Sequence, residues 1–159
     1  MRAIFKSDIH DDLLKLTWPG FRNGRSVNNV ISIIDDDASL RWALKRLLQS
    51  DGLLVAEFAS AEEFLHSGHC QNSACLLLDL QLSGMSGIEL QKELRVSHPR
   101  LPIIFMSANV NEMTRAQAMC SGAIEFLEKP IDEQALFAAI DACLILYRSQ
   151  RTPASHSGG

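Results

Sequence analysis

Short polar motifs follow four apolar runs of this chain, and their residue types are those that handle phosphate and magnesium. The runs span residues 30–34, 74–78, 102–106 and 123–127, and the polar residues after them include Asp35, Asp36, Asp79, Ser107 and Lys129. If the runs are parallel strands, their carboxyl ends meet at one edge of a sheet, where open α/β sheets bind ligands. The pattern therefore predicts a magnesium-dependent site at which an aspartate is phosphorylated.

The segments around these motifs predict an alternation of strands and helices. Near-continuous apolar runs, typical of a sheet covered on both faces, predict strands at 30–34, 53–58, 74–78, 102–106 and 123–127. Helical spacing and breaker residues predict helices at about 38–50, 61–67, 87–97, 111–121 and 131–147. Ser60 and Glu63 predict a capping box at the start of the second helix. This alternation indicates an α/β fold with a parallel sheet and right-handed crossovers.

Over about residues 29–148 the chain resembles the receiver domain of two-component response regulators. The motifs that carry the resemblance are Asp35–Asp36, Asp79 with the loop to Gly87, Ser107–Ala108, and Phe126 with Lys129–Pro130. The Gly84-Met-Ser-Gly87 loop is most similar to the FixJ-type subgroup. The resemblance implies a flavodoxin-like, doubly wound, five-stranded parallel sheet of order 2-1-3-4-5 with five helices. That order reverses between the two strands that carry the acids, which is where such sheets bind ligands.

Three aspartates are expected to form the acidic part of the site. The resemblance implies that Asp79 is the phosphoacceptor, and a carboxylate can act as a nucleophile that forms an acyl phosphate. It also implies Mg²⁺ bound directly by Asp36 and Asp79, through water by Asp35, and by the backbone carbonyl of Gln81. Three close carboxylates repel one another, and a divalent cation with oxygen ligands removes that conflict. The ordinary alternatives are a helix-capping Asp79 and a solvated acidic turn; Asp37 is expected to cap the first helix.

Three further residues take roles from the resemblance. Lys129 matches the lysine that pairs with a phosphoryl oxygen, where charge must be neutralised during phosphoryl transfer. Ser107 matches the switch hydroxyl, and Phe126 matches the switch aromatic that packs inward when the hydroxyl moves. The bond between Lys129 and Pro130 is expected to be cis, because cis bonds are inexpensive only before proline. The alternatives are a surface lysine in a turn and a Phe126 that belongs simply to the core.

One position departs from the family pattern. The fourth residue after Asp79 is commonly proline in the family and is Ser83 here. This difference predicts a looser loop after the third strand and leaves the chemistry of the site unchanged.

Length and composition predict one domain with a sizeable core, since the 159 residues are 47% hydrophobic. The sequence has neither a stretch long enough to span a membrane nor an apolar signal core, so we expect a cytoplasmic protein.

Residues 30–159 carry 16 acids against 10 Lys and Arg, which argues against nucleic-acid binding by the domain. The cysteines show no metal spacing, and buried free thiols are expected.

The chain divides into three parts by composition. We expect an N-terminal extension at 1–29 that is partly disordered, a receiver domain at 30–148 and a disordered tail at 149–159. Only a short tail follows the last helix, so a single-domain regulator or a fragment of a longer one is expected.

The function predicted from these motifs is that of a response-regulator receiver. It would accept a phosphoryl group from a sensor histidine kinase, a phosphotransfer protein or a small donor onto Asp79 with Mg²⁺, and switch a protein-contact face. It is expected to be a signalling domain that catalyses its own phosphorylation and dephosphorylation, not an enzyme. The alternatives are a phosphorylation-independent binding module and a metal-dependent aspartyl phosphatase. The second requires an Asp-x-Asp-x-Thr motif after the first strand, which this chain lacks.

The last helix predicts a contact face, because it has more apolar residues than one buried stripe requires. Its inner half is expected to hold Ala135, Leu136, Ala139, Cys143 and Leu146, and its outer half Phe137, Leu144 and Ile145. Excess apolar surface indicates an interface. Homodimerisation through helix 111–121, strand 123–127 and this helix is therefore a hypothesis.

Trp42 predicts a second contact surface. The first helix is expected to bury Leu40, Ala43, Leu44 and Leu47, which leaves Trp42 outward among basic residues. Tryptophan and arginine are favoured interface anchors, so Trp42 is expected to contact the kinase. The alternative is a ring that only covers its own Arg46 or Arg41 side chain.

Overall fold

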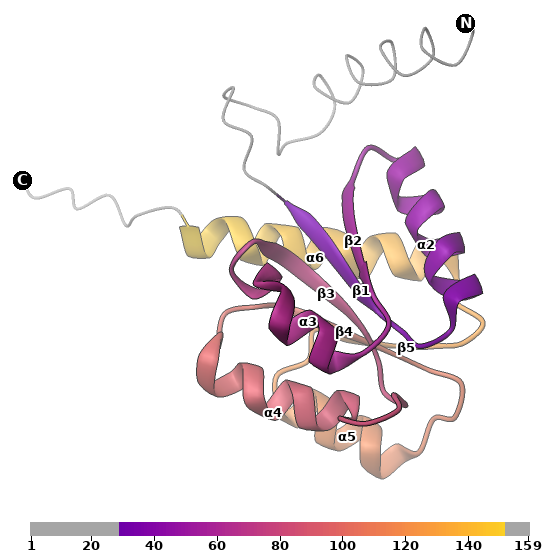
Figure 1. Ribbon diagram of the computed structural model, residues 1–159, viewed down its shortest axis with the longest axis vertical. Helices are drawn as coiled ribbons and strands as arrows, with labels where there is room; N and C mark the ends of the chain where they lie inside the picture. The colour runs from indigo at the N-terminus through magenta and orange to yellow at the C-terminus, as the bar shows by residue number, and fades with distance from the viewer. Residues whose placement is uncertain (1–28, 152–159) are drawn as a thin grey trace, which may run out of the picture.

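A five-stranded parallel sheet forms the centre of the molecule (Figure 1). The computed structural model describes residues 29–151. The strands are β1 (Val30–Ile34), β2 (Leu54–Phe58), β3 (Ser73–Asp79), β4 (Ile103–Ser107) and β5 (Glu125–Glu128). Their order across the sheet is β2-β1-β3-β4-β5, and each neighbouring pair is parallel. The predicted α/β fold and the predicted strand order are confirmed.

Helices cover both faces of this sheet. They are α2 (Ala38–Ser50), α3 (Ala61–Ser67), α4 (Gly87–Ser97), α5 (Glu112–Cys120) and α6 (Glu133–Arg151), with a short 3₁₀ helix at His69–Gln71. One hydrophobic core lies between the sheet and α2 with α6, and a second lies between the sheet and α3, α4 and α5 (Figure 1). The buried strands β3 and β4 contribute to both cores, which explains their near-continuous apolar sequence.

Local caps determine where three of the helices begin. Asp37 accepts backbone hydrogen bonds from Ser39 and Leu40 at the start of α2, as predicted. Ser60 accepts the backbone N–H of Glu63, but the Glu63 carboxylate bonds Ala59, so the predicted capping box is closed one residue earlier than expected. Ser86 and Glu89 form a capping box at the start of α4. These three helices occupy the predicted residues 38–50, 61–67 and 87–97.

Two predicted elements differ from the structure by two or more residues at one end or both. The last strand was expected at 123–127 and is found at 125–128, because Ala123 still bonds back to Ala118 at the end of α5. The last helix extends to Arg151, so residues 149–151 are helical and do not belong to a disordered tail. Arg151 is held there by a hydrogen bond and a ring contact with Tyr147. The other residues assigned to the tail and the extension 1–28 lie outside the described range.

The buried face of α2 is rotated relative to the prediction. Leu44 and Leu48 are buried, Leu40 and Leu47 are half-buried, and Ala43 is exposed. Leu48 was not predicted, because the apolar residues of this helix span more than one stripe and only the packing against the sheet selects among them.

The face of α6 differs from the prediction in a similar way. Leu144 is buried and Leu146 is exposed, which reverses the predicted positions of both. Ile145 is 66% exposed, as expected, and Phe137 is half-buried.

Among the cysteines, Cys70, Cys75 and Cys143 are buried thiols, and Cys120 is exposed. In the described range, no helix combines the length and the hydropathy that crossing a bilayer would require.

Candidate functional site

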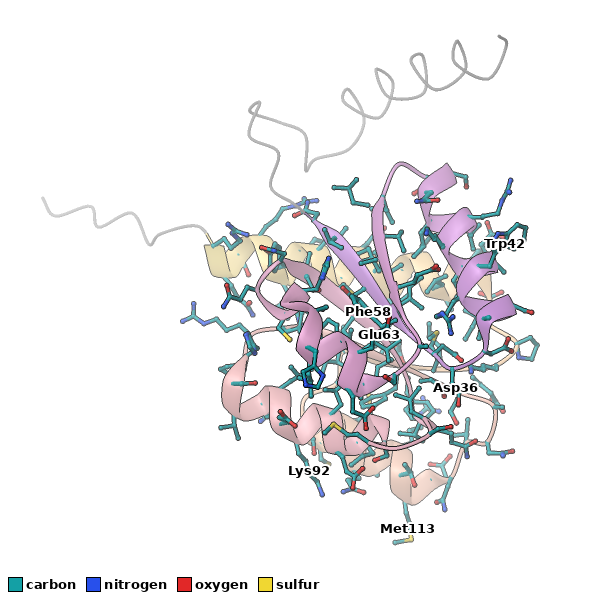
Figure 2. The ribbon with its side chains drawn as sticks, in the orientation of Figure 1. Asp36, Trp42, Phe58, Glu63, Lys92 and Met113 are labelled. Atoms are coloured by element: carbon teal, nitrogen blue, oxygen red, sulfur yellow. The ribbon has the colours of Figure 1, made fainter. Side chains whose placement is uncertain are left out.

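Three aspartates from two neighbouring strands meet at the carboxyl edge of the sheet. Asp35 and Asp36 follow β1, and Asp79 ends β3. Asp35 is fully buried, Asp79 is 5% exposed and Asp36 is exposed. One carboxylate oxygen of each lies within 4.8 Å of the others. Figure 2 shows Asp36 at this edge, between β1 and α2. The edge therefore gathers three anionic groups, two of which water scarcely reaches.

Lys129 bridges the two buried members of this group. It follows β5, its bond to Pro130 is cis, and its backbone N–H donates to the carbonyl of Ser107 over 2.8 Å. Its Nζ donates to Oδ2 of Asp35 over 2.8 Å and to Oδ2 of Asp79 over 3.2 Å. The ammonium group thus lies between the two carboxylates and connects β5 with β1 and β3.

Backbone N–H groups satisfy the other oxygen of each buried carboxylate. Oδ1 of Asp35 accepts the N–H of Asp37 over 2.8 Å, and Oδ1 of Asp79 accepts the N–H of Gln81 over 3.0 Å. Arg41, one turn into α2, donates through Nη1 to the backbone carbonyl of Asp35 over 2.5 Å. These bonds hold both carboxylates in place and leave the exposed carboxylate of Asp36 as the most accessible of the three.

The environment shifts the acid–base behaviour of two groups. Burial raises the pKa of Asp79, and the negative charge of Asp35 adds to this effect, while the N–H of Gln81 and the charge of Lys129 oppose it. Burial by itself would lower the pKa of Lys129, but its hydrogen bonds and charge interactions with Asp35 and Asp79 outweigh burial and raise it. The lysine therefore stays charged, and the ionised form of Asp79 is disfavoured without a further cation.

A hollow of about 480 Å³ opens over this group. Its wall contains the three acids and Lys129, together with Asp37, Gln81, Leu82, Ser83 and Ala108. Carboxylate oxygens at this spacing, one of them exposed, are a ligand set that suits a hard cation such as Mg²⁺. The predicted residues Asp35, Asp36, Asp79, Gln81 and Lys129 are thus brought together.

Ser107 and Phe126 do not line this hollow, and Phe126 lines a different one, together with Arg115. The hydroxyl of Ser107 is buried, donates to the carbonyl of Asn109 over 3.0 Å and accepts its N–H over 3.3 Å. Phe126 is buried with its ring centroid 6.2 Å from that of Phe105, and the guanidinium of Arg115 lies 6.0 Å from its ring centroid. In this state the hydroxyl is bonded within its own loop and the aromatic ring is packed inward.

Two contacts of the site were not predicted. Ser83 donates to Oδ2 of Asp36 over 3.4 Å, and Arg41 bonds the carbonyl of Asp35. The sequence signal for Arg41 is its place one turn after the helix cap, which directs it back towards the preceding strand. Ser83 was singled out only as a departure from proline.

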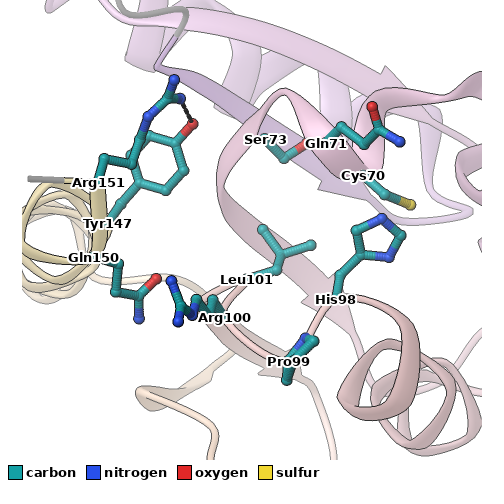
Figure 3. Close-up of a pocket in the computed structure, with 10 residues that line it drawn as sticks. All are labelled: Cys70, Gln71, Ser73, His98, Pro99, Arg100, Leu101, Tyr147, Gln150 and Arg151. Carbon is teal, nitrogen blue, oxygen red and sulfur yellow. Dashed lines mark hydrogen bonds between the residues drawn. The ribbon is translucent and has the colours of Figure 1, made fainter. Parts of the chain in front are cut away.

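Another hollow, of about 470 Å³, lies at the opposite edge of the sheet (Figure 3). Its lining comes from the start of β3 and the residues before it, from the residues before β4, and from the end of α6, and includes Ser73, Leu101 and Tyr147. None of the acids described above reaches it, so the chemistry of the acid group is confined to the carboxyl edge.

Comparison with known proteins agrees with this geometry. The family model described as the response regulator receiver domain matches residues 31–141. The response regulator protein TodT of Pseudomonas putida F1 is 37% identical over 135 residues, which are 85% of this chain and 60% of TodT. The transcriptional regulatory protein FixJ of Azorhizobium caulinodans is 39% identical over 114 residues, which are 72% of this chain and 54% of FixJ.

A solved structure gives the same result for the fold. The response regulator StyR superimposes with a TM-score of 0.72 and 42% identity, over 77% of this chain and 62% of StyR. The chain therefore spans less than two thirds of the length of each of these three relatives.

Removing the charge of Asp79 is expected to stabilise the metal-free protein. Since the folded-state pKa of Asp79 is raised, the folded protein holds this proton more tightly than the unfolded chain, and stability falls as the pH rises from about 4 through the folded pKa. In EDTA at pH 7, Asp79→Asn should therefore raise the free energy of unfolding. Urea denaturation between pH 4 and pH 7 measures this, and the gain should shrink towards pH 4. A variant less stable than the wild type at pH 7 would contradict the argument.

Proposed function

Because the chain belongs to the response regulator receiver family, we propose that it accepts a phosphoryl group on Asp79 and thereby switches a protein-contact face. The observation that carries the proposal is the contact of Lys129 with both Asp35 and Asp79 at the mouth of an acid-lined hollow. A lone capping aspartate or a solvated acidic turn would not need a half-buried lysine shared between two buried carboxylates.

The chemistry proposed for Asp79 is nucleophilic substitution at phosphorus. An oxygen of Asp79 forms the new P–O bond while the bond from phosphorus to the donor breaks, either P–N of a phosphohistidine or P–O of acetyl phosphate. The donor's histidine nitrogen or acetate oxygen leaves with the electron pair of the broken bond. The ammonium of Lys129 is placed to bond a phosphoryl oxygen in place of one of its present carboxylate partners.

Asp36 and Asp79 are the residues proposed to bind Mg²⁺ directly, with Asp35 acting through water and Gln81 through its backbone carbonyl. The cation would neutralise charge on the transferring phosphoryl group. The exposure of Asp36 and the shape of the hollow, which is open to solvent beside small Ala108, leave room for a cation and a phosphoryl group.

The proposed switch uses Ser107 and Phe126. In the described state the hydroxyl of Ser107 bonds Asn109, so a phosphoryl group on Asp79 would offer it a stronger, charged acceptor. Movement of Ser107 would change the packing around Phe126. The ring of Phe126 now packs against Phe105 and below Arg115. The change would then reach α5, which carries Arg115.

The protein is proposed to be a cytoplasmic signalling domain that catalyses its own phosphorylation and slow dephosphorylation. Its donor would be a sensor histidine kinase, a phosphotransfer protein or a small phosphodonor. Direct nucleic-acid binding by the described domain is not expected, given its excess of acids.

The phosphoacceptor assignment predicts a mass change that depends on one residue. Incubation with acetyl phosphate and Mg²⁺ should add the mass of one phosphoryl group, measured on the intact protein. Asp79→Asn and addition of EDTA should each abolish the change. Phosphorylation of Asp79→Asn at the wild-type rate would exclude Asp79 as acceptor. Absence of phosphorylation in the wild type would favour a phosphorylation-independent binding module.

The face formed by α5, β5 and α6 is proposed to mediate homodimerisation. Exposed Ile145 and Leu146 continue a stripe that begins at Ala138 and Ala142, beside a hollow of about 560 Å³ with Arg115 and Asp132 on its rim. Sedimentation with beryllofluoride, a stable phosphoryl mimic, should show a dimer that Ile145→Glu disrupts. Ile145 is 66% exposed, so this change should leave the fold intact. A monomer with and without the mimic would refute the hypothesis.

Trp42 is proposed to contact the phosphodonor domain of the kinase. Its ring is 60% exposed and points away from the sheet (Figure 2), with Arg46 4.9 Å from the ring centroid. Trp42→Ala should slow transfer from the cognate kinase by about tenfold and leave the rate with acetyl phosphate unchanged. Met113→Ala, at a residue on α5 that is 81% exposed, is the control. Equal rates for wild type and Trp42→Ala with the kinase would mean that the ring only covers Arg46.

A further inference from the structure

The loop between β3 and α4 forms one wall of the hollow and lacks the proline that would stiffen it. Residues 80–86 connect the two elements, and Gln81, Leu82 and Ser83 line the hollow. The ends of the loop are held by backbone bonds, from Leu80 to Met106 over 2.9 Å and from Gly87 to Leu80 over 3.1 Å. Something must hold the middle of the loop if Gln81 and Ser83 are to keep their places.

The middle of the loop is held from α3. The backbone N–H of Met85 donates to Oε1 of Glu62 over 2.8 Å, across 23 residues of sequence. In the described part of the chain, the other hydrogen bond that connects residues 82–85 with a different element is the longer one from Ser83 to Asp36. Glu62 is therefore the stronger of the two anchors.

The backbone of the loop is shaped to receive this carboxylate. Gly84 has φ of +79°, and a Cβ atom at this position would lie 2.7 Å from Oε1 of Glu62. Glycine is thus required both for the left-handed backbone and for the close approach of the carboxylate. The N–H of Met85 also lowers the pKa of Glu62, so the acceptor is ionised at neutral pH.

The neighbouring Glu63 caps α3, so the carboxylate of Glu62 can bond the loop. Glu63 accepts the N–H of Ala59 over 2.8 Å, while Ser60 accepts the N–H of Glu63 over 3.0 Å. Glu63 thus acts only at the start of the helix, whereas Glu62, which also interacts with Ser60 there, is the one that reaches the loop. They form a matched pair for experiment.

We propose that Glu62 is a positioning residue of the phosphoacceptor site, which holds the β3–α4 loop so that Gln81 and Ser83 face the acid group. This proposal rests on the proposed function for its consequence, namely that loss of the anchor weakens Mg²⁺ binding and phosphorylation. The positioning itself is a property of the loop and can be measured without either.

The direct test is amide hydrogen exchange at Met85 in the metal-free protein. Glu62→Ala should lose protection at this amide, whereas Glu62→Gln, whose side chain keeps an acceptor oxygen, should retain most of it. Glu63→Ala should lower the stability of α3 and leave the Met85 amide protected. Unchanged protection in Glu62→Ala would overturn the proposal.

The consequence is tested by Mg²⁺ titration calorimetry on the same variants. Since groups that orient a metal's ligands affect affinity by about tenfold or more, Glu62→Ala should weaken Mg²⁺ binding by roughly five- to tenfold, with rescue by Glu62→Gln. Gly84→Ala should resemble Glu62→Ala, because the added Cβ displaces the carboxylate.

The two failures can be told apart. If Glu62→Ala loses Met85 protection but binds Mg²⁺ as tightly as the wild type, the anchor does not act on the site and the proposal is wrong. If the wild type itself neither binds Mg²⁺ nor becomes phosphorylated, the proposed function fails, whatever the loop does.

Discussion

The shared contact of Lys129 with Asp35 and Asp79 is the interaction on which this edge of the sheet depends. Both carboxylates are buried, and two buried negative charges at this distance would be costly without a cation between them. The lysine comes from 94 and 50 residues away along the chain, so its placement requires β1, β3 and β5 to be assembled. The contact of Lys129 with both aspartates can therefore form only when these three strands are in place.

The strands of this molecule form its rigid core, and the loops that follow them can adjust. The two cores on either side of the sheet hold β1, β3 and β4 with fully buried apolar side chains. The polar groups lie at the carboxyl ends of those strands and in the loops that follow, where hydrogen bonds such as Met85 to Glu62 and Ser107 to Asn109 help to fix the loop positions. Such bonds contribute only about 1 kcal/mol each, so a new charged group in the hollow can rearrange them without disturbing the cores.

Residues whose signals are local were predicted well, and residues that depend on packing were not. The helix at 61–67 was placed correctly because Ser60 caps it from an adjacent position, and the helix at 87–97 because a glycine-containing loop precedes it and Pro99 follows it. The last strand was misplaced because an apolar segment does not reveal which of its residues pair with β4. Leu48, Leu144 and Leu146 were misassigned because a helix with a wide apolar surface is oriented by the sheet against which it packs.

The sequence by itself determined the class of fold and the set of polar groups at the strand ends, since strand alternation and the strand-end motifs are encoded in neighbouring residues. Only the tertiary structure decided which oxygen of Asp79 faces Lys129 and that Glu62 reaches the loop after β3. Contacts between residues that are tens of positions apart depend on register and helix rotation. Those are settled by the packing of the whole core, which no local pattern contains.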